Sequence, residues 1–99
     1  MFGKKLSFYE CRDYFITHIR SFDYTVLADT NSCFCVRTEK GSRFITITIN
    51  NFKKGQVVVD ITDSFGMLRI PKEKFSKESE YRMFIINSCT SIQKELNKQ

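Results

Sequence analysis

The chain has 99 residues, which is room for one hydrophobic core and excludes a second domain. An apolar fraction of 41% beside a charged fraction of 27% is typical of a globular protein, and one proline and four glycines leave little material for disordered stretches. The net charge of +5 is shared by both halves of the chain and forms no basic tail, so it permits binding to a polyanion without requiring it.

Neither export nor membrane insertion is expected. No apolar run reaches the roughly 20 residues of a membrane-spanning helix, and residues 1–5 lead into a helix with polar residues, not into the apolar block of a signal peptide. Cys11, Cys33, Cys35 and Cys89 are too few and too irregularly spaced for the disulfide framework of a secreted protein. We therefore expect a cytoplasmic protein with reduced thiols and no membrane partner.

The first predicted element is an amphipathic helix that begins after Ser7. Ser7 and Glu10 have the three-residue spacing of a capping box, in which the serine oxygen accepts a hydrogen bond from the amide of residue 10. Beyond them, apolar residues recur at steps of three and four, which places them on one face of a helix. That face comprises Phe8, Cys11, Phe15, Ile19 and Phe22.

From Tyr24 the apolar period changes to two and β-branched residues dominate, which predicts strands. The four predicted strands are residues 24–29, 33–38, 43–50 and 57–62. Asn or Gly stands in each segment between them, so hairpins in a meander are the simplest connection.

Alternation within these strands predicts two different sheet faces. Ile45, Ile47 and Ile49 point to one side, and threonines dominate the other side. This is the pattern of an antiparallel sheet that is covered on one side only.

The C-terminal part of the chain is predicted to form a second amphipathic helix. Residues 67–70 are expected to be a short extended piece that stops at Pro71, which disfavours helix at the residue before it. Ser76 or Ser79 is the expected N-cap of the helix that follows. Its apolar face comprises Tyr81, Phe84, Ile85, Ser88, Cys89, Ile92 and Leu96. The predicted fold is thus a single α+β domain over residues 1–99, a two-layer sandwich of an N-terminal helix, a four-stranded antiparallel meander and a C-terminal helix.

Cys33 and Cys35 share one side of a strand, where two thiols could begin a metal site with Cys11, His18 or Cys89. Their spacing is not the two-residue gap of a zinc site, and Cys11 and Cys89 fit the helix cores, so packing is favoured and no metal or cofactor is expected. A cysteine nucleophile would need His18 as its base, and no pattern suggests an oxyanion hole. We therefore expect no enzymatic activity.

Basic residues gather near three predicted turns, within residues 37–43, 53–54 and 72–77. If these turns lay on one side of the fold, they would contact the phosphates of a nucleic acid. The order of helix, strands and helix resembles that of the double-stranded RNA-binding domain, although Glu73 and Glu78 stand among the lysines and the Gly-Pro-x-His loop of that family is missing. The candidate nucleic-acid contacts are Arg43, Lys53, Lys54, Lys72, Lys74 and Lys77.

The uncovered sheet face and an edge strand remain as surfaces for a partner protein, which would bind a flat patch with an aromatic anchor or add a strand. The plain alternative is a sheet face that is merely solvated. We favour a non-catalytic interaction protein, a regulator or inhibitor of the kind that phages and other mobile elements encode, which binds another protein or a second copy of itself. Nucleic-acid binding is the alternative. The expected partner contacts are Arg37, Phe44, Thr46, Thr48, Val58 and Asp60.

Overall fold

The computed structural model describes residues 5–98, so the expectation that residues 1–4 belong to no export signal lies outside the described residues. Helix α1 spans Phe8–Ile19 and begins as predicted, because the side chain of Ser7 accepts a hydrogen bond from the Glu10 amide at 3.4 Å. Its buried residues are Phe8, Cys11, Phe15 and Ile19. The predicted apolar face is thus confirmed for four of its five residues, whereas Phe22 lies beyond the end of the helix and is partly buried against the core.

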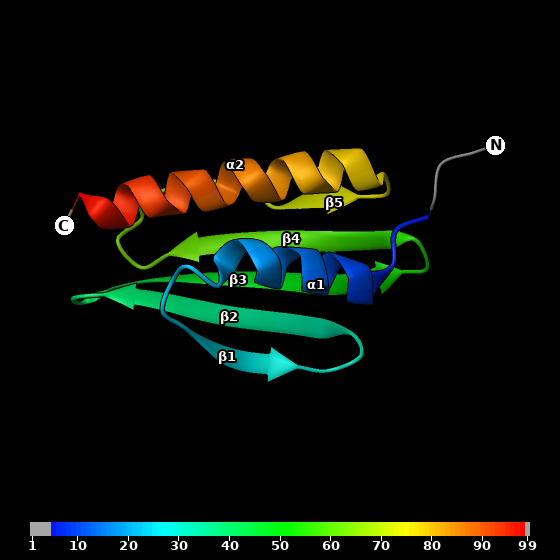
Figure 1. The fold of residues 1–99 in the computed structure, drawn as a ribbon, viewed down its shortest axis with the longest axis horizontal. Helices are drawn as coiled ribbons and strands as arrows, with labels where there is room; N and C mark the ends of the chain where they lie inside the picture. The colour runs from blue at the N-terminus through cyan, green and yellow to red at the C-terminus, as the bar shows by residue number, and fades with distance from the viewer. Residues whose placement is uncertain (1–4, 99) are drawn as a thin grey trace.

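Five strands form one antiparallel sheet in which every strand pairs with the next along the chain (Figure 1). The strands are β1 (Tyr24–Asp29), β2 (Cys33–Lys40), β3 (Arg43–Lys53), β4 (Gln56–Asp63) and β5 (Glu73–Phe75). The predicted meander is confirmed, and β1 and β5 form the two edges of the sheet.

The sheet has one strand more than the four predicted. β5 is only three residues long, and Glu73 and Phe75 pair with Val59 and Val57 of β4. So short a segment carries no readable alternation, and it becomes a strand only through the neighbour it pairs with. The extended piece expected at residues 67–70 forms no strand.

β3 extends three residues beyond its predicted end. The pairing register with β4 shifts between Asn51 and Lys53, which makes a β-bulge around Phe52, and the chain reverses only at Lys54 and Gly55. Gly55 has a φ of 81°, a conformation that favours glycine. Phe52 consequently lies on the sheet and not in a loop.

Helix α2 spans Glu78–Asn97 and buries the predicted apolar face, with Phe84 partly buried against the core. Its N-cap is Lys77, which makes no capping hydrogen bond from its side chain, so neither Ser76 nor Ser79 caps the helix. Ser76 precedes the cap position and Ser79 lies inside the first turn. Two serines near the right place could not show from sequence which residue would stand at the helix boundary.

Both helices lie on the same side of the sheet, running along its strands (Figure 1). A hydrogen bond from the Tyr81 hydroxyl of α2 to the Cys11 carbonyl of α1, 2.6 Å long, joins them. Between helices and sheet lies one hydrophobic core, to which alternate residues of β2, β3 and β4 contribute. Its members from the strands that are fully shielded from solvent are Val36, Ile45, Ile47, Ile49, Val57 and Val59. The predicted two-layer α+β sandwich is confirmed.

Candidate interaction surface

The open face is the sheet face that α1 and α2 leave uncovered, and the strand register determines its side chains. Cys35, Thr48 and Asp60 are direct cross-strand neighbours in its central row. Because successive side chains of a strand point to opposite faces, every second residue on either side of these three lies on the same face. We define the open face by Cys33, Cys35, Arg37, Phe44, Thr46, Thr48, Asn50, Val58, Asp60 and Thr62. All six residues expected to contact a partner protein lie on this face.

The middle of the open face is almost free of charge. Thr46, Thr48 and Val58 are half-buried among their neighbours, and the Thr48 hydroxyl donates a hydrogen bond to the sulfur of Cys35 at 3.3 Å. Asp60 is half-buried and takes part in no ion pair within residues 5–98. The middle of the open face therefore carries one carboxylate, that of Asp60, among uncharged side chains.

An aromatic and cationic pair stands at the corner of the open face near the β2–β3 turn. The guanidinium of Arg37 packs over the Phe44 ring, 5.0 Å from the ring centroid, and Nε of Arg37 lies 3.2 Å from a carboxylate oxygen of Glu39. Phe44 is 40% exposed. The charge of Arg37 is thus matched within the chain, while the ring beside it remains accessible to a partner.

The four cysteines are divided between the two faces of the sheet. Cys33 and Cys35 lie on the open face, whereas Cys11 and Cys89 are buried on the helices, so the ligand set considered for a metal is not brought together. Within residues 5–98 no three His, Cys, Asp or Glu side chains converge as metal ligands would. His18 belongs to α1, where its Nδ1 lies 3.0 Å from the Tyr14 carbonyl oxygen, and it does not reach the open-face thiols.

The thiols of Cys11, Cys33 and Cys89 are poorly suited to nucleophilic chemistry. Burial raises the pKa of Cys11 to about 12 and that of Cys89 to about 11, and burial with a smaller effect of Cys35 also raises the pKa of Cys33. A reactive cysteine needs the opposite shift, because the thiolate is the nucleophile. None of the thiols of Cys11, Cys33 and Cys89 is therefore activated as a nucleophile.

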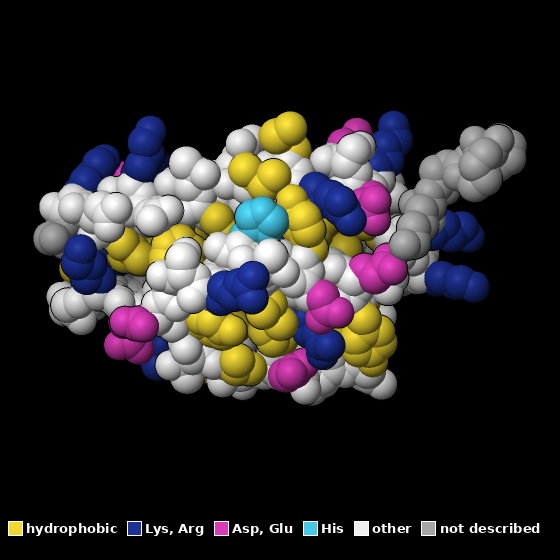
Figure 2. Space-filling view, in the orientation of Figure 1, with side chains coloured by type: hydrophobic (Ala, Val, Ile, Leu, Met, Phe, Trp, Pro, Cys, Tyr) yellow, Lys and Arg dark blue, Asp and Glu magenta, His cyan; other side chains and the backbone are white. Residues whose placement is uncertain are grey.

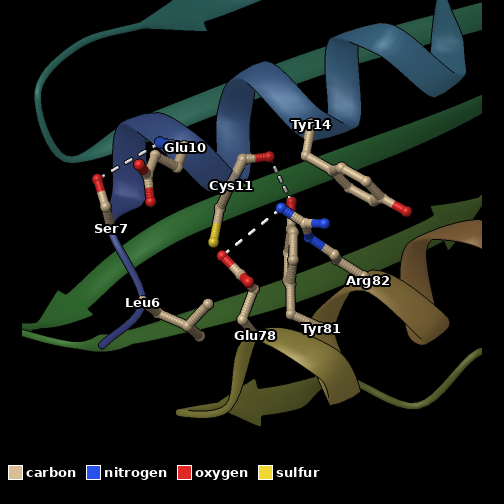
Figure 3. A pocket seen from close by; sticks show the side chains of 8 residues that line it. All are labelled: Leu6, Ser7, Glu10, Cys11, Tyr14, Glu78, Tyr81 and Arg82. Atoms are coloured by element: carbon tan, nitrogen blue, oxygen red, sulfur yellow. Dashed lines mark hydrogen bonds and ion pairs between the residues drawn. The ribbon is translucent and has the colours of Figure 1, made fainter. Parts of the chain in front are cut away.

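A small cavity lies where the first turns of α1 and α2 meet (Figure 3). Cys11 and Tyr81 line it, and an ion pair between Arg82 and Glu78, 3.6 Å long, stands at its side. Its volume of about 10 Å³ is room for at most one water molecule. The cavity is therefore a packing gap between the two helices and not a ligand site.

The three basic turns do not converge on one side. The β2–β3 turn, between Lys40 and Arg43, lies at one end of the sheet, and the β3–β4 turn with Lys53 and Lys54 lies at the other end. Lys74 on β5 and Lys77 before α2 are exposed beside the β3–β4 turn, and Lys72 is exposed one residue before β5. Two of the three turns therefore meet, and the third is separated from them by the length of β3.

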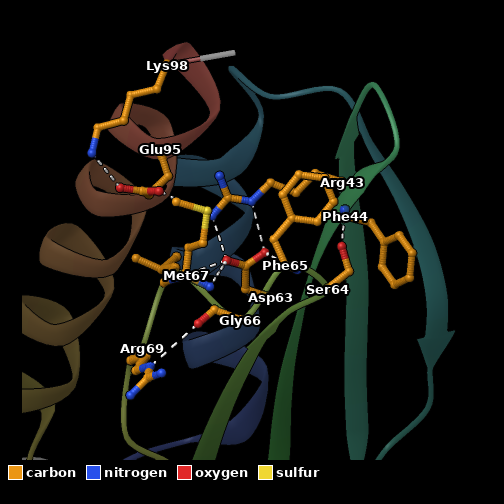
Figure 4. A network of polar contacts seen from close by, with 11 residues as sticks. Arg43, Phe44, Asp63, Ser64, Phe65, Gly66, Met67, Arg69, Glu95 and Lys98 are labelled. Atoms are coloured by element: carbon orange, nitrogen blue, oxygen red, sulfur yellow. Dashed lines mark hydrogen bonds and ion pairs between the residues drawn. The ribbon is translucent and has the colours of Figure 1, made fainter.

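Arg43 does not serve as a phosphate contact, because its side chain is only 2% exposed and is held in a buried ion pair (Figure 4). Its Nε donates to Oδ1 of Asp63 at 2.9 Å, and its Nη2 contacts Oδ2 of Asp63 at 2.5 Å and Glu95 at 3.3 Å. The Asp63 side chain is fully buried. This network joins β3, β4 and the last turn of α2.

Asp63 also holds the loop that follows β4. Its carboxylate accepts hydrogen bonds from the amides of Phe65, Met67 and Leu68 at 2.8–3.1 Å. The bonds from Arg43 outweigh burial and, with these amides, hold the pKa of Asp63 well below its ordinary value. The network therefore has a structural role. Its hydrogen bonds to Asp63 explain why the extended piece expected at residues 67–70 lies against Asp63 and does not join the sheet.

Two surface features were not foreseen from sequence. Phe52, placed in a turn by its Asn and Lys neighbours, is 54% exposed on the sheet beside lysines. Lys5 lies next to Lys77 and Gly55 through two isolated β-bridges of the chain before α1. The apolar character of Phe52 between Asn51 and Lys53 could have indicated that the strand continues through this position. No local feature of the sequence predicts where Lys5 lies.

The chain matches no protein-family model, no curated protein and no solved structure. Neither α1 nor α2, the two helices of the described residues, is long and apolar enough to cross a membrane. The function is therefore argued from geometry and chemistry alone.

Proposed function

We propose that this protein is a non-catalytic interaction protein that binds another protein through the open face. The observation that carries the proposal is an uncovered and nearly uncharged sheet face with an exposed Phe44 stacked against Arg37 at its corner. Aromatic residues and arginine are enriched in protein interfaces, whose centres are depleted of charged residues.

The open face supplies part of the area that an interface needs. Its residues come from the three strands β2, β3 and β4, which are about 4.8 Å apart and about eight residues long, so its footprint is roughly 380 Å². Side-chain relief raises the accessible area above that footprint, toward the roughly 800 Å² that each partner contributes to a standard interface. Thr46 and Thr48 at its centre are half-buried, and a threonine hydroxyl can donate and accept hydrogen bonds with polar groups of a partner.

The sheet edges are less suited to binding than the face. β1 carries a bulge between Val26 and Ala28 that interrupts its register, and β5 is only three residues long. Bulges and short edge strands are two devices by which proteins prevent another chain from adding a strand. The geometry therefore favours a partner that lies flat on the sheet over one that extends it.

A pair of matched substitutions tests this proposal. Thr48→Arg places a long charged side chain at the centre of the open face, and Thr90→Arg places the same side chain on the exposed surface of α2. The tagged protein and both variants are incubated with nuclease-treated extract of the source cells, and light scattering measures the mass of each purified protein. We expect the wild type and the Thr90 variant to retain one stoichiometric protein, and the Thr48 variant to lose it.

Two outcomes would refute the proposal. One is a wild-type protein that is strictly monomeric and retains nothing; the other is a Thr48→Arg variant that keeps its partner in full. If the wild type is a dimer and only the Thr48 variant is a monomer, the partner is a second copy of the chain, bound through the same face.

A further inference from the structure

One end of the molecule gathers lysines from three separate parts of the chain. Lys5 pairs with Lys77 in one isolated antiparallel bridge, and Leu6 pairs with Gly55 in another. The stem of the Lys5 side chain lies 3.7–3.9 Å from the position that a Cβ on Gly55 would take. These contacts bring the segment before α1, the β3–β4 turn and the start of α2 to one place.

We define the basic end as Phe52 with the lysines that surround it, namely Lys5, Lys53, Lys54, Lys74 and Lys77. Lys and Arg side chains project into solvent from this end, on the right in the space-filling view (Figure 2). Within residues 5–98, only Lys77 among these lysines has a carboxylate partner, Glu80 at 4.0 Å, with both side chains well exposed. No carboxylate of the described part of the chain forms an ion pair with the other four lysines.

The acidic residues nearby are directed elsewhere or already paired. Glu73 borders a depression beside α2, on the helix side of β5, whereas its neighbour Lys74 pairs with Val58 of the open face. Glu78 forms its ion pair with Arg82. The alternation of β5 therefore separates the carboxylate of Glu73 from the basic end, although the two residues are adjacent in sequence.

Phe52 gives the basic end an exposed aromatic ring. The ring is 54% exposed, and the Nζ atoms of Lys74 and Lys53 lie 5.0 Å and 5.8 Å from its centroid. Lysines beside an exposed ring form the combination that binds single-stranded nucleic acid, since the ammonium groups contact phosphates while a base stacks on the ring. A base inside a duplex is already stacked and cannot reach such a ring.

We propose that the basic end is a binding site for single-stranded nucleic acid, which adjoins the protein-binding open face where Lys74 pairs with Val58. Phe52 stacks on one unpaired base, and Lys53, Lys54 and Lys74 contact the flanking phosphates. Binding of a duplex would use all three basic turns, and the third of them, the β2–β3 turn, does not support it. That turn lies at the far end of β3, where Arg37 and Arg43 are both paired with carboxylates.

The test measures binding of the full chain to a fluorescent 15-nucleotide oligothymidine by anisotropy, between about 50 and 200 mM salt. Lys53→Gln with Lys54→Gln removes two charges from the basic end, and Lys40→Gln with Lys94→Gln removes two exposed charges elsewhere as a matched control. Phe52→Leu keeps the residue apolar while it removes the stacking ring. Circular dichroism verifies that each variant is folded.

We expect the wild type to bind the oligonucleotide with an affinity that falls as salt rises. The Lys53 and Lys54 double variant should lose about 1.4 units of salt slope, Phe52→Leu should bind about tenfold more weakly, and the control should resemble the wild type. A 15-base-pair duplex should bind more weakly than the single strand and be insensitive to Phe52→Leu.

Four results would overturn this site. They are no binding at about 50 mM salt, equal losses in the control double variant, equal binding of the duplex, or binding to vesicles of phosphatidylserine and phosphatidylcholine with none to the oligonucleotide. Thr48→Arg, which blocks the open face and removes no residue of the basic end, is expected not to weaken oligonucleotide binding. Failure of this site and failure of the proposed protein-binding function are therefore distinguishable.

Discussion

Arg43 and Lys53 stand at the two ends of the same strand, β3, about 33 Å apart along its length. Arg43 is buried against Asp63, and Lys53 is exposed beside the ring of Phe52. Two basic residues that look equivalent in sequence thus have opposite roles. One holds the fold together, and the other contributes to a charged surface.

The buried pair predicts that stability depends on pH through Asp63. Because the pKa of Asp63 is lower in the folded protein than in the unfolded chain, its stabilising effect is complete above about pH 5 and is lost as the pH falls through the folded value. Asp63→Asn removes the charge and turns an amide group toward Arg43. We expect its melting temperature at pH 7 to fall by about 20 °C.

Thermal unfolding between about pH 2 and pH 7 checks this prediction. The wild type should lose stability steeply on acidification, and Asp63→Asn should lose less, since the variant has already lost the ion pair. Glu95→Gln, which weakens the partly exposed arm of the network, provides a milder variant if Asp63→Asn does not fold. Parallel pH profiles for wild type and Asp63→Asn would show that Asp63 carries no such role.

The hydrogen bond between the helices predicts a cost for Tyr81→Phe. The hydroxyl of Tyr81 donates to the Cys11 carbonyl at 2.6 Å, and the side chain is almost fully buried. Its removal leaves a buried carbonyl without that donor, which should lower the free energy of unfolding by about 1–3 kcal/mol in urea titration. Tyr9→Phe, on a ring that is 48% exposed, is the matched control and should leave stability within about 0.5 kcal/mol of wild type.

The division of the cysteines predicts two classes of thiol reactivity. Cys33 and Cys35 are half-buried on the open face, whereas Cys11 and Cys89 are buried and have raised pKa values of about 12 and 11. Alkylation of the native protein with iodoacetamide at about pH 8, followed by peptide mass spectrometry, should modify the first pair well before the second. Labelling of Cys11 as rapid as that of Cys35 would contradict the assignment of α1 to the core.

Local patterns predicted both helices, four of the five strands and the two sheet faces. The period of two in residues 43–50 placed Ile45, Ile47 and Ile49 toward the helices, and Ser7 was identified as a helix cap from its spacing to Glu10. These signals are readable because each depends on neighbours within a few positions of the chain. The same alternation placed every expected partner contact on the open face.

Features that depend on distant residues were not predictable. The burial of Arg43 requires Asp63 and Glu95, which are 20 and 52 positions away in the chain. The basic end required knowledge of which turns share an end of the sheet, and the separation of Glu73 from Lys74 required that β5 exist at all. A cluster of charged residues in the sequence therefore predicts a charged surface only when the strand pairing shows which face each side chain occupies.

Protection of Cys33 and Cys35 in a complex is the most direct test of the proposed function, because both thiols lie on the open face. The protein would be alkylated alone and again in its purified complex with the partner retained from nuclease-treated extract. We predict that the complex protects Cys33 and Cys35 at least tenfold relative to the isolated protein, as expected for side chains within an interface from which water is excluded. Unchanged labelling of both thiols in a stoichiometric complex would show that the partner binds elsewhere and would contradict the account.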